Sequence, residues 1–183
     1  NGLYRFNRIS ETFKPFLYQK DSLNSLSNNV IGPLMEDEDG NLWVGTVHGM
    51  NKISADHRNV TNYYPDTSKQ EGKPNVVYDL LTDQYNRFWV GTGDGVGIFN
   101  KKQGTFRLFK HHSDNPETIS NNEVFCIGET SSGLWFGTVQ GGLNKLVSFS
   151  EDTPRFKRLP FEEGKNTLPH AFIKTITEDS RGN

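Results

Sequence analysis

The sequence is poor in sulfur and in long apolar runs. It has one cysteine, Cys126, and two methionines among 183 residues, so no disulfide can form within the chain. No apolar run approaches the roughly 20 residues that a membrane-spanning helix requires. These absences exclude a disulfide-stabilised fold and predict that this segment makes no membrane contact.

The chain also lacks an excess of charge of either sign. Its 20 basic and 22 acidic residues give a formal net charge of −2, so we expect no nucleic-acid partner. Only 33% of the residues are hydrophobic, yet 12% are aromatic, and buried aromatic rings favour a packed fold over a disordered chain. The 18 glycines indicate many tight turns and few long helices.

What the chain does contain is a repeat. Its three tryptophans, Trp43, Trp89 and Trp135, are spaced 46 residues apart. Each stands in the same context: Leu42-Trp43-Val44-Gly45-Thr46, Phe88-Trp89-Val90-Gly91-Thr92 and Leu134-Trp135-Phe136-Gly137-Thr138. A fixed period of this length is typical of repeat architectures and governs every later interpretation.

Each repeat predicts four short antiparallel strands, which we call A, B, C and D in chain order. In the first repeat they are expected at Val30 to Met35, Leu42 to Val47, Met50 to Ser54 and Val60 to Tyr64. Polar turns such as Asp39-Gly40-Asn41 separate apolar and aromatic runs, which is typical of hairpins. The pattern recurs 46 residues later, with the tryptophan always on strand B.

A four-stranded unit of about 40–50 residues has the size of a β-propeller blade. We therefore predict an all-β fold of four-stranded antiparallel blades, forming a segment of a larger, seven-bladed ring. The expected parts are the outer strands of a split blade (residues 1–18), three blades (30–64, 76–110 and 124–159) and the first strand of a further blade (172–183).

The tryptophans are expected to fill the space between adjacent blades. A single small sheet cannot cover both of its faces, whereas blades stacked around an axis cover each other. The alternative is that Trp43, Trp89 and Trp135 are exposed platforms on which sugar rings stack. Their identical placement in every repeat favours the interior of the seams.

The repeat resembles that of the two-component regulator propeller family. The resemblance rests on Leu26-Ser27-Asn28-Asn29-Val30, on the turn and strand from Glu36 to Thr46, and on Gly49-Met50-Asn51-Lys52-Ile53. The segments from Ile119 to Val124 and from Gly141 to Leu146 match equally well. The second repeat departs, because Asn86-Arg87 replaces Gly-Asn and Gly97-Ile98-Phe99 replaces Asn-Lys-Ile.

The resemblance implies a setting for the chain. Such propellers form the periplasmic sensor region of membrane-anchored hybrid histidine kinases that respond to carbohydrate breakdown products. It implies an oligosaccharide ligand, the remaining blades and downstream signalling domains of the same protein as partners, and a homodimer as a further possibility. Two alternatives stay open: a propeller lyase of the streptogramin-lyase type, and a scaffold that serves only protein interaction.

Several motifs invite a chemical interpretation that the sequence does not favour. The glycines of Gly91 to Gly97 lack the spacing and the following helix of a phosphate loop. His111-His112 point to opposite faces of an extended chain, and Glu36 to Asp39 lacks the spacing of a calcium loop. Cys126 lies in an apolar strand. We expect no cofactor, no metal and no catalytic residue.

The best candidates for ligand binding come from topology. The D–A loops and the B–C loops of a propeller emerge on one face, around the axis. These loops carry short amides, imidazoles and a carboxylate, which suit sugar hydroxyls but are also common turn residues. The candidates are Asn28, Asn29, His48, Asn75, Asp94, Asn121, Asn122, Gln140 and His170.

Overall fold

The computed structural model describes residues 2–66, 75–159 and 168–182; Asn1 and Asn183 of the predicted end segments lie outside them. The described residues form 14 β-strands and no helix, which confirms the all-β prediction. No helix long and apolar enough to cross a membrane occurs in these ranges. The chain divides into two compact units, Asn1–Val77 and Tyr78–Asn183.

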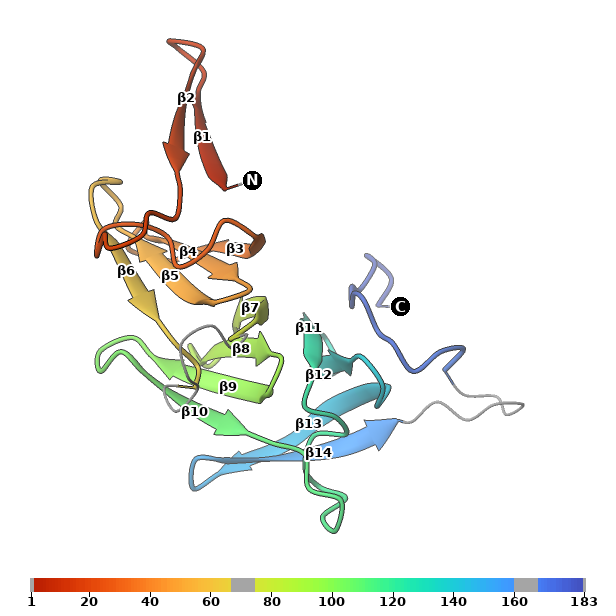
Figure 1. Cartoon of the computed structure of the whole chain (residues 1–183). Coiled ribbons are helices and arrows are strands. Elements are labelled where there is room, and N and C mark those ends of the chain that lie inside the picture. Colours follow the sequence, from red (N-terminus) through yellow and green to blue (C-terminus); the bar gives the residue numbers. More distant parts are fainter. Residues whose placement is uncertain (1, 67–74, 160–167, 183) are drawn as a thin grey trace. The chain divides into compact units, whose positions relative to one another are not determined.

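The first unit contains a hairpin and one blade (Figure 1). The hairpin pairs β1 with β2, and the blade has the strand order β3-β4-β5-β6. All of these pairs are antiparallel. The strands are β1 (Leu3–Asn7), β2 (Thr12–Phe16), β3 (Ile31–Glu36), β4 (Leu42–Thr46), β5 (Gly49–Ile53) and β6 (Val60–Tyr63).

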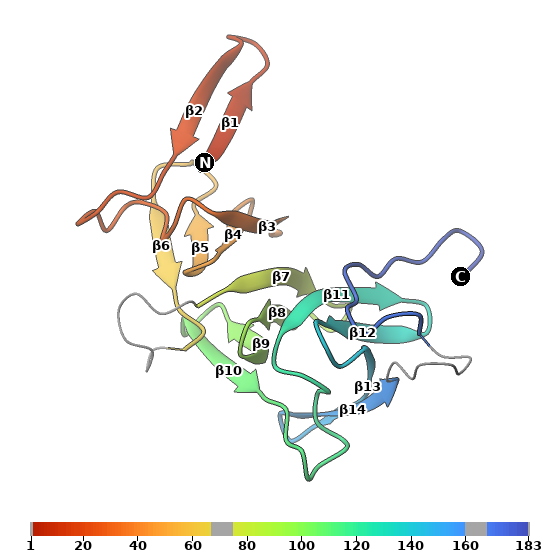
Figure 2. The ribbon, with the colours of Figure 1, turned by 45° about the vertical axis from the view of Figure 1, so that its right-hand side comes forward.

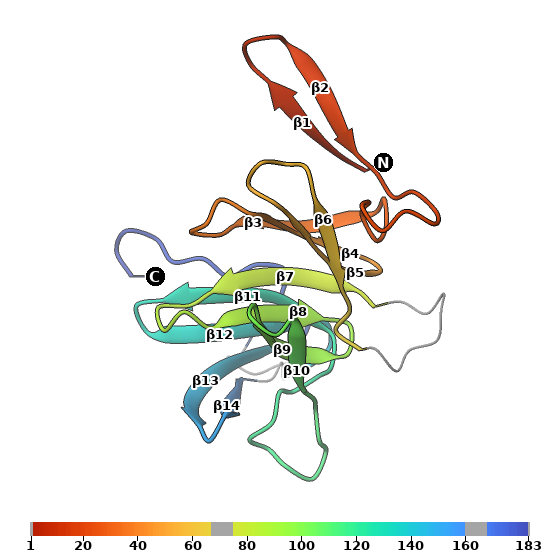
Figure 3. The same cartoon turned by 90° about the vertical axis from the view of Figure 1, so that its left-hand side faces the viewer.

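The second unit contains two blades, each with four neighbouring strands in chain order. Their innermost strands, β7 and β11, lie side by side in Figures 2 and 3. The strands are β7 (Val77–Thr82, whose first residue ends the first unit), β8 (Phe88–Thr92), β9 (Gly95–Asn100), β10 (Thr105–Phe109), β11 (Val124–Thr130), β12 (Gly133–Thr138), β13 (Leu143–Ser150) and β14 (Thr153–Leu159).

The four strands expected in the first blade begin and end within one residue of β3 to β6. The last predicted strand differs, because residues 172–177 pair with no strand among the described residues. This segment runs along the third blade: Ile173 N donates to Thr138 O (3.1 Å), and Gly142 N donates to Ala171 O (3.0 Å). A ladder needs a partner strand, and the sequence contains no further Leu-Trp-Val-Gly-Thr segment after it.

Each tryptophan indole finds a hydrogen-bond acceptor in the A–B turn of its own blade. Trp43 Nε1 donates to Asp37 Oδ2 (2.7 Å), and Trp89 Nε1 donates to Asp83 Oδ2 (2.8 Å). In the third blade the turn is shorter, and Trp135 Nε1 donates to the hydroxyls of Thr130 and Ser132 (both 3.1 Å). The indoles can therefore be buried without an unsatisfied N–H.

A buried Ser–Thr–Asn network explains the Ser-Asn and Asn-Lys motifs of the first and third repeats. Asn51 Oδ1 accepts from Ser27 N (2.7 Å), and Ser27 Oγ lies 3.0 Å from Thr46 Oγ1. Ser120, Thr138 and Asn144 repeat the arrangement in the third blade. The second blade has Gly97 at the asparagine position, where an added Cβ would lie 3.0 Å from Leu108 Cδ2. In the first and third blades, the network thus joins the D–A loop to strand C through hydrogen bonds.

The outer strand of two blades is held by the D–A loop that leads into the same blade. In the first unit, Val60 N of β6 donates to Asn24 Oδ1 (2.6 Å). In the second unit, Phe156 N of β14 donates to Glu117 O (2.8 Å), and Arg158 donates to Thr118 O (2.8 Å). These contacts satisfy part of an exposed strand edge, which would otherwise be free to pair with other chains.

The seam between the two blades of the second unit is built on Trp89. Its ring is fully buried and lies 5.2 Å from Phe136 and 5.9 Å from Phe149, measured between ring centroids. Closer to the axis, Asp79 Oδ2 of β7 accepts from Ile127 N of β11 (2.7 Å). The seam prediction is thus confirmed for Trp89. Trp135 is only partly buried, because no sheet of the described residues packs against its outer side.

Candidate ligand-binding face

The predicted ligand-binding residues of the first unit lie on neighbouring loops. Val47 N in the B–C loop donates to Val30 O (3.3 Å), and Asn75 N donates to Val47 O (3.2 Å). His48 and Asn75 also form a backbone bridge. Asn28, Asn29, His48 and Asn75 therefore stand along one edge of the blade, where the D–A loops and the B–C loop meet.

The second unit shows the same arrangement with different residues. Gly95 N beside Asp94 donates to Asn122 O (2.6 Å), and Gly142 N donates to Ala171 O beside His170 (3.0 Å). Val139 N, next to Gln140, donates to Glu123 O (3.0 Å). Within each unit, the loops predicted to share a face are thus joined through their backbones. We call this edge of each unit the loop face.

The five asparagines of the loop face use their amide oxygens inside the fold. Asn28 and Asn121 accept from the backbone N–H two residues later, at 2.8 Å each, in Asx turns. Asn29, Asn75 and Asn122 accept from backbone N–H groups at or beyond the end of the preceding strand D. The sequence could not separate this loop-holding role from ligand binding, because an asparagine in a loop suits both roles.

The other four candidates are half-buried or exposed side chains. His48 is half-buried, with its ring edge-on to Tyr64 at 6.0 Å between centroids. Asp94 pairs with Lys110 (Oδ2 to Nζ, 2.9 Å), so its charge is balanced. Gln140 is exposed, and the exposed His170 accepts from Phe172 N at Nδ1 (2.9 Å). These side chains can offer hydrogen-bond donors and acceptors to a small polar ligand.

Burial shifts two titratable groups of the second unit. Burial and the nearby Asp79 carboxylate together raise the pKa of the Cys126 thiol to about 11. Burial also raises the pKa of Asp79, against hydrogen bonds from Ile127 N and Leu80 N that lower it. A thiol with so high a pKa is protonated at neutral pH and is a poor nucleophile.

In the acidic turn of the first blade, the Asp37 carboxylate accepts hydrogen bonds from within the same blade. Asp37 accepts from Trp43 Nε1, from Asn41 N (2.9 Å) and from Asn41 Nδ2 (3.1 Å). Among the described residues, no three His, Cys, Asp or Glu side chains lie close enough together to hold a metal ion. The geometry of this turn is accounted for by its role in anchoring the tryptophan.

Three hollows on the surface of the described residues lie away from the loop face. One of about 170 Å³ in the first unit includes Lys14, Phe16 and His57 in its lining. Two in the second unit, of about 430 and 270 Å³, share Phe149. None of the nine candidate residues lines any of the three. Sequence reasoning missed these hollows, because they form where turns and hairpins of different strands meet.

The strand pattern and the seam define the class of this protein as one built from β-propeller blades. More specifically, the sequence model described as the two-component regulator propeller matches residues 25–48 and 71–94. These two segments thus match the two-component regulator propeller repeat, which confirms the resemblance there, including in the second repeat, where a departure was expected. None of the curated proteins matches it.

Two solved structures from B. thetaiotaomicron are similar to the chain. The extracellular domain of the hybrid two-component system BT4673 is 22% identical over 100% of this chain, with a TM-score of 0.77. The extracellular domain of the hybrid two-component system BT3049 is 25% identical over 80% of this chain, with a TM-score of 0.62. The chain spans only 23% and 20% of the length of those two structures.

Proposed function

We propose that the chain is a noncatalytic propeller segment in the periplasmic sensor region of a two-component signalling protein. In this proposal it recognises a carbohydrate breakdown product and biases a histidine kinase elsewhere in the same protein. The observation that carries the proposal is the pair of two-component regulator propeller repeats at residues 25–48 and 71–94. Both similar structures are extracellular domains of hybrid two-component systems, which supports the same setting.

The ligand would bind at the loop face. Within each unit, a B–C loop and D–A loops meet there, and several polar groups can therefore reach one small molecule, as binding sites usually require. His48 in the first unit and Asp94, Gln140 and His170 in the second supply the contacting side chains. The asparagines Asn28, Asn29, Asn75, Asn121 and Asn122 hold the loops in place through their amide oxygens. Asn75 is buried and its amide nitrogen donates to Asp66 O (2.8 Å), so the amide N–H groups proposed to face the ligand are those of the other four.

Signalling would follow from a shift between conformations rather than from chemistry on the ligand. A ligand moves a conformational equilibrium only through its different affinity for the two states. Contacts to loops of neighbouring blades would favour the state in which those loops are closest together. The remaining blades, the downstream signalling domains and a second copy of the protein are the proposed partners that receive this shift.

Amide hydrogen exchange tests the proposal directly. The chain is incubated with a panel of neutral and acidic oligosaccharides, and deuterium uptake is followed by mass spectrometry. A bound saccharide should slow exchange in residues 28–30, 47–49, 93–95, 121–123 and 139–142, while the turn at residues 54–59 serves as the internal control. Unchanged uptake in all five loops with every saccharide would contradict the proposal.

A further inference from the structure

The hollow of about 430 Å³ in the second unit is a candidate for a separate binding site. It lies where the A–B turn of the second blade meets the β13–β14 hairpin of the third, and Tyr85, Arg87, Glu129 and Phe149 are among its lining residues. Its size falls within the roughly 300–1,000 Å³ typical of small-molecule sites. It contains no residue of the loop face, so it needs an explanation of its own.

This hollow coincides with a departure from the repeat. In the first blade, Asn41 Nδ2 donates to Asp37, the carboxylate that anchors the tryptophan. In the second blade, Arg87 takes the asparagine's place and donates from Nε to Asp83 Oδ2 (2.6 Å). Arg87 thus keeps the structural hydrogen bond of Asn41 and adds a guanidinium head that the blade fold does not require.

The guanidinium of Arg87 is fixed among aromatic rings. Its central carbon lies 4.8 Å from the ring centroids of Tyr85 and Phe149, and 5.4 Å from that of Trp89. The side chain is 20% exposed. Within the described part of the chain, its two Nη groups donate no hydrogen bond to a protein acceptor. They are therefore rigidly placed donors at the hollow, and preorganised donors bind a ligand at a lower entropic cost.

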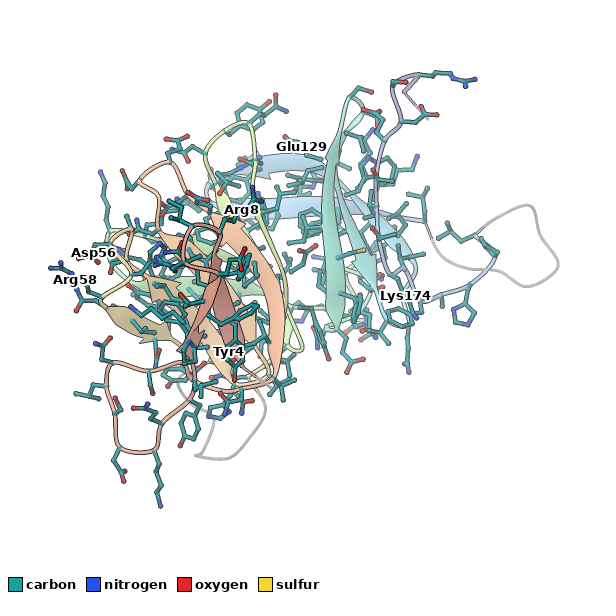
Figure 4. All side chains as sticks on the ribbon, turned by 90° about the horizontal axis from the view of Figure 1, so that it is seen from above. Tyr4, Arg8, Asp56, Arg58, Glu129 and Lys174 are labelled. Carbon is teal, nitrogen blue, oxygen red and sulfur yellow. The ribbon has the colours of Figure 1, made fainter. Side chains whose placement is uncertain are left out.

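Tyr85 and Glu129 complete the lining. Tyr85 is 70% exposed although Arg87 covers part of its ring, so it presents an aromatic surface to solvent. Glu129 lies at the end of β11 (Figure 4), and its Oε1 accepts from Gln84 N across the seam (3.3 Å). The hollow thus combines a guanidinium, a carboxylate and an aromatic surface. Because the charge of Arg87 is already paired with Asp83, the Glu129 carboxylate disfavours an anion, and an occupant must offer an apolar ring face, both donors and acceptors, and no negative charge.

We propose that this hollow binds a neutral saccharide unit. The pyranose ring stacks on Tyr85, the Nη groups of Arg87 donate to sugar hydroxyl oxygens, and Glu129 accepts from a sugar hydroxyl. A sugar ring has an apolar C–H face and hydroxyl groups that both donate and accept. Because the hollow is open, the affinity is in the millimolar range, about −4 kcal/mol.

The test uses the three tryptophan indole N–H signals in nuclear magnetic resonance spectra. The chain is titrated with maltotriose, cellotriose, xylotriose and mannotriose, and with tri-galacturonic acid as the anionic comparison. A neutral trisaccharide should shift the Trp89 signal, because Trp89 Nε1 and Arg87 Nε share Asp83 Oδ2. The Trp43 signal, from the first unit, should stay in place.

Two variants identify the residues. Arg87→Asn installs the residue of the first blade and keeps a donor for Asp83, so the fold is retained while the Nη groups are lost. Tyr85→Ala removes the aromatic surface. Each should weaken binding at the hollow, measured from the Trp89 signal, by about tenfold or more, whereas His48→Ala on the loop face should change the binding measured from that signal by less than about twofold.

The outcomes separate this site from the loop face. The proposal of a saccharide site at the hollow is wrong if no neutral trisaccharide shifts the Trp89 signal at about 10 mM. It is also wrong if both variants bind like the parent chain, or if only tri-galacturonic acid binds. If the Trp89 shift is lost in Arg87→Asn but kept in His48→Ala, the saccharide site at the hollow is supported, independently of any binding at the loop face.

Discussion

At the scale of single residues, one carboxylate in the A–B turn of each of the first two blades anchors the tryptophan of that blade. Asp83 is almost fully buried and accepts from Trp89 Nε1, Arg87 Nε and the backbone N–H groups of Tyr85 and Arg87. Asp37 has the same role in the first blade. The sequence showed an acidic turn in the first blade that the other blades do not repeat. It could not show that the acid serves the tryptophan six residues later, since that bond depends on how the hairpin folds back.

Asp79 gives the chain a predictable dependence of stability on pH. Burial raises its folded-state pKa above the ordinary value of about 3.9. The unfolded chain then loses its proton first, so the free energy of unfolding falls as the pH rises through the window from about 4 to the raised value. In Asp79→Asn the amide oxygen can still accept from Ile127 N, and this loss should disappear.

Urea denaturation of both proteins at pH 4 and pH 7 measures the effect. Asp79→Asn should gain stability relative to the parent chain between the two pH values. Asp152→Asn, whose side chain is 80% exposed, is the matched control and should follow the parent. A gain as large in Asp152→Asn as in Asp79→Asn would show that the buried carboxylate is not the cause.

At the scale of elements, the strands could be predicted from apolar and aromatic runs separated by turn residues, whereas the irregularities of the strands could not. The hairpin of β13 and β14 is longer than expected and turns at Glu151-Asp152, which both have positive φ (49° and 57°) without being glycine. Two residues of positive φ suit a two-residue hairpin turn. Glycine or asparagine would have marked that turn in the sequence, and neither is present.

The seam between sheets gives the element-scale prediction. Trp89→Ala should destabilise the chain by about 3–5 kcal/mol, the usual cost of deleting a large buried aromatic side chain. Trp135→Ala should cost clearly less, because Trp135 is only partly buried and has Lys145 Nζ 5.1 Å from its ring centroid. Chemical denaturation followed by circular dichroism compares the two. Equal losses, or a loss under about 1 kcal/mol for Trp89→Ala, would rule out the seam role.

At the scale of the whole molecule, the repeat was the most informative feature of the sequence. The 46-residue period fixed the fold class, and topology indicated which loops share a face in each unit. The roles of the individual loop residues were harder to predict from the sequence. Asn29, Asn75 and Asn122 accept from backbone N–H groups of the chain that leaves strand D. An asparagine can bind this backbone or a ligand equally well, so the residue type does not distinguish the two roles.

The hollow at Tyr85 and Arg87 was beyond sequence reasoning for a similar reason. The departure at Asn86-Arg87 was visible as a weaker match to the repeat. Its consequence appears only when Phe149 of the next blade is placed 4.8 Å from the guanidinium. The proposed site lies where a residue that departs from the repeat meets the neighbouring repeat, and the period of the sequence does not report that contact.

Isothermal calorimetry of the chain with the oligosaccharide panel tests most directly whether the loop face is the sensor site. His48→Ala and Asp94→Ala should each weaken the binding of at least one saccharide by about tenfold, or 1.4 kcal/mol. Asp56→Ala, in the exposed turn that also holds Arg58 (Figure 4), should leave it unchanged. The account is contradicted if no saccharide binds, or if both loop-face variants bind every saccharide within about twofold of the parent chain.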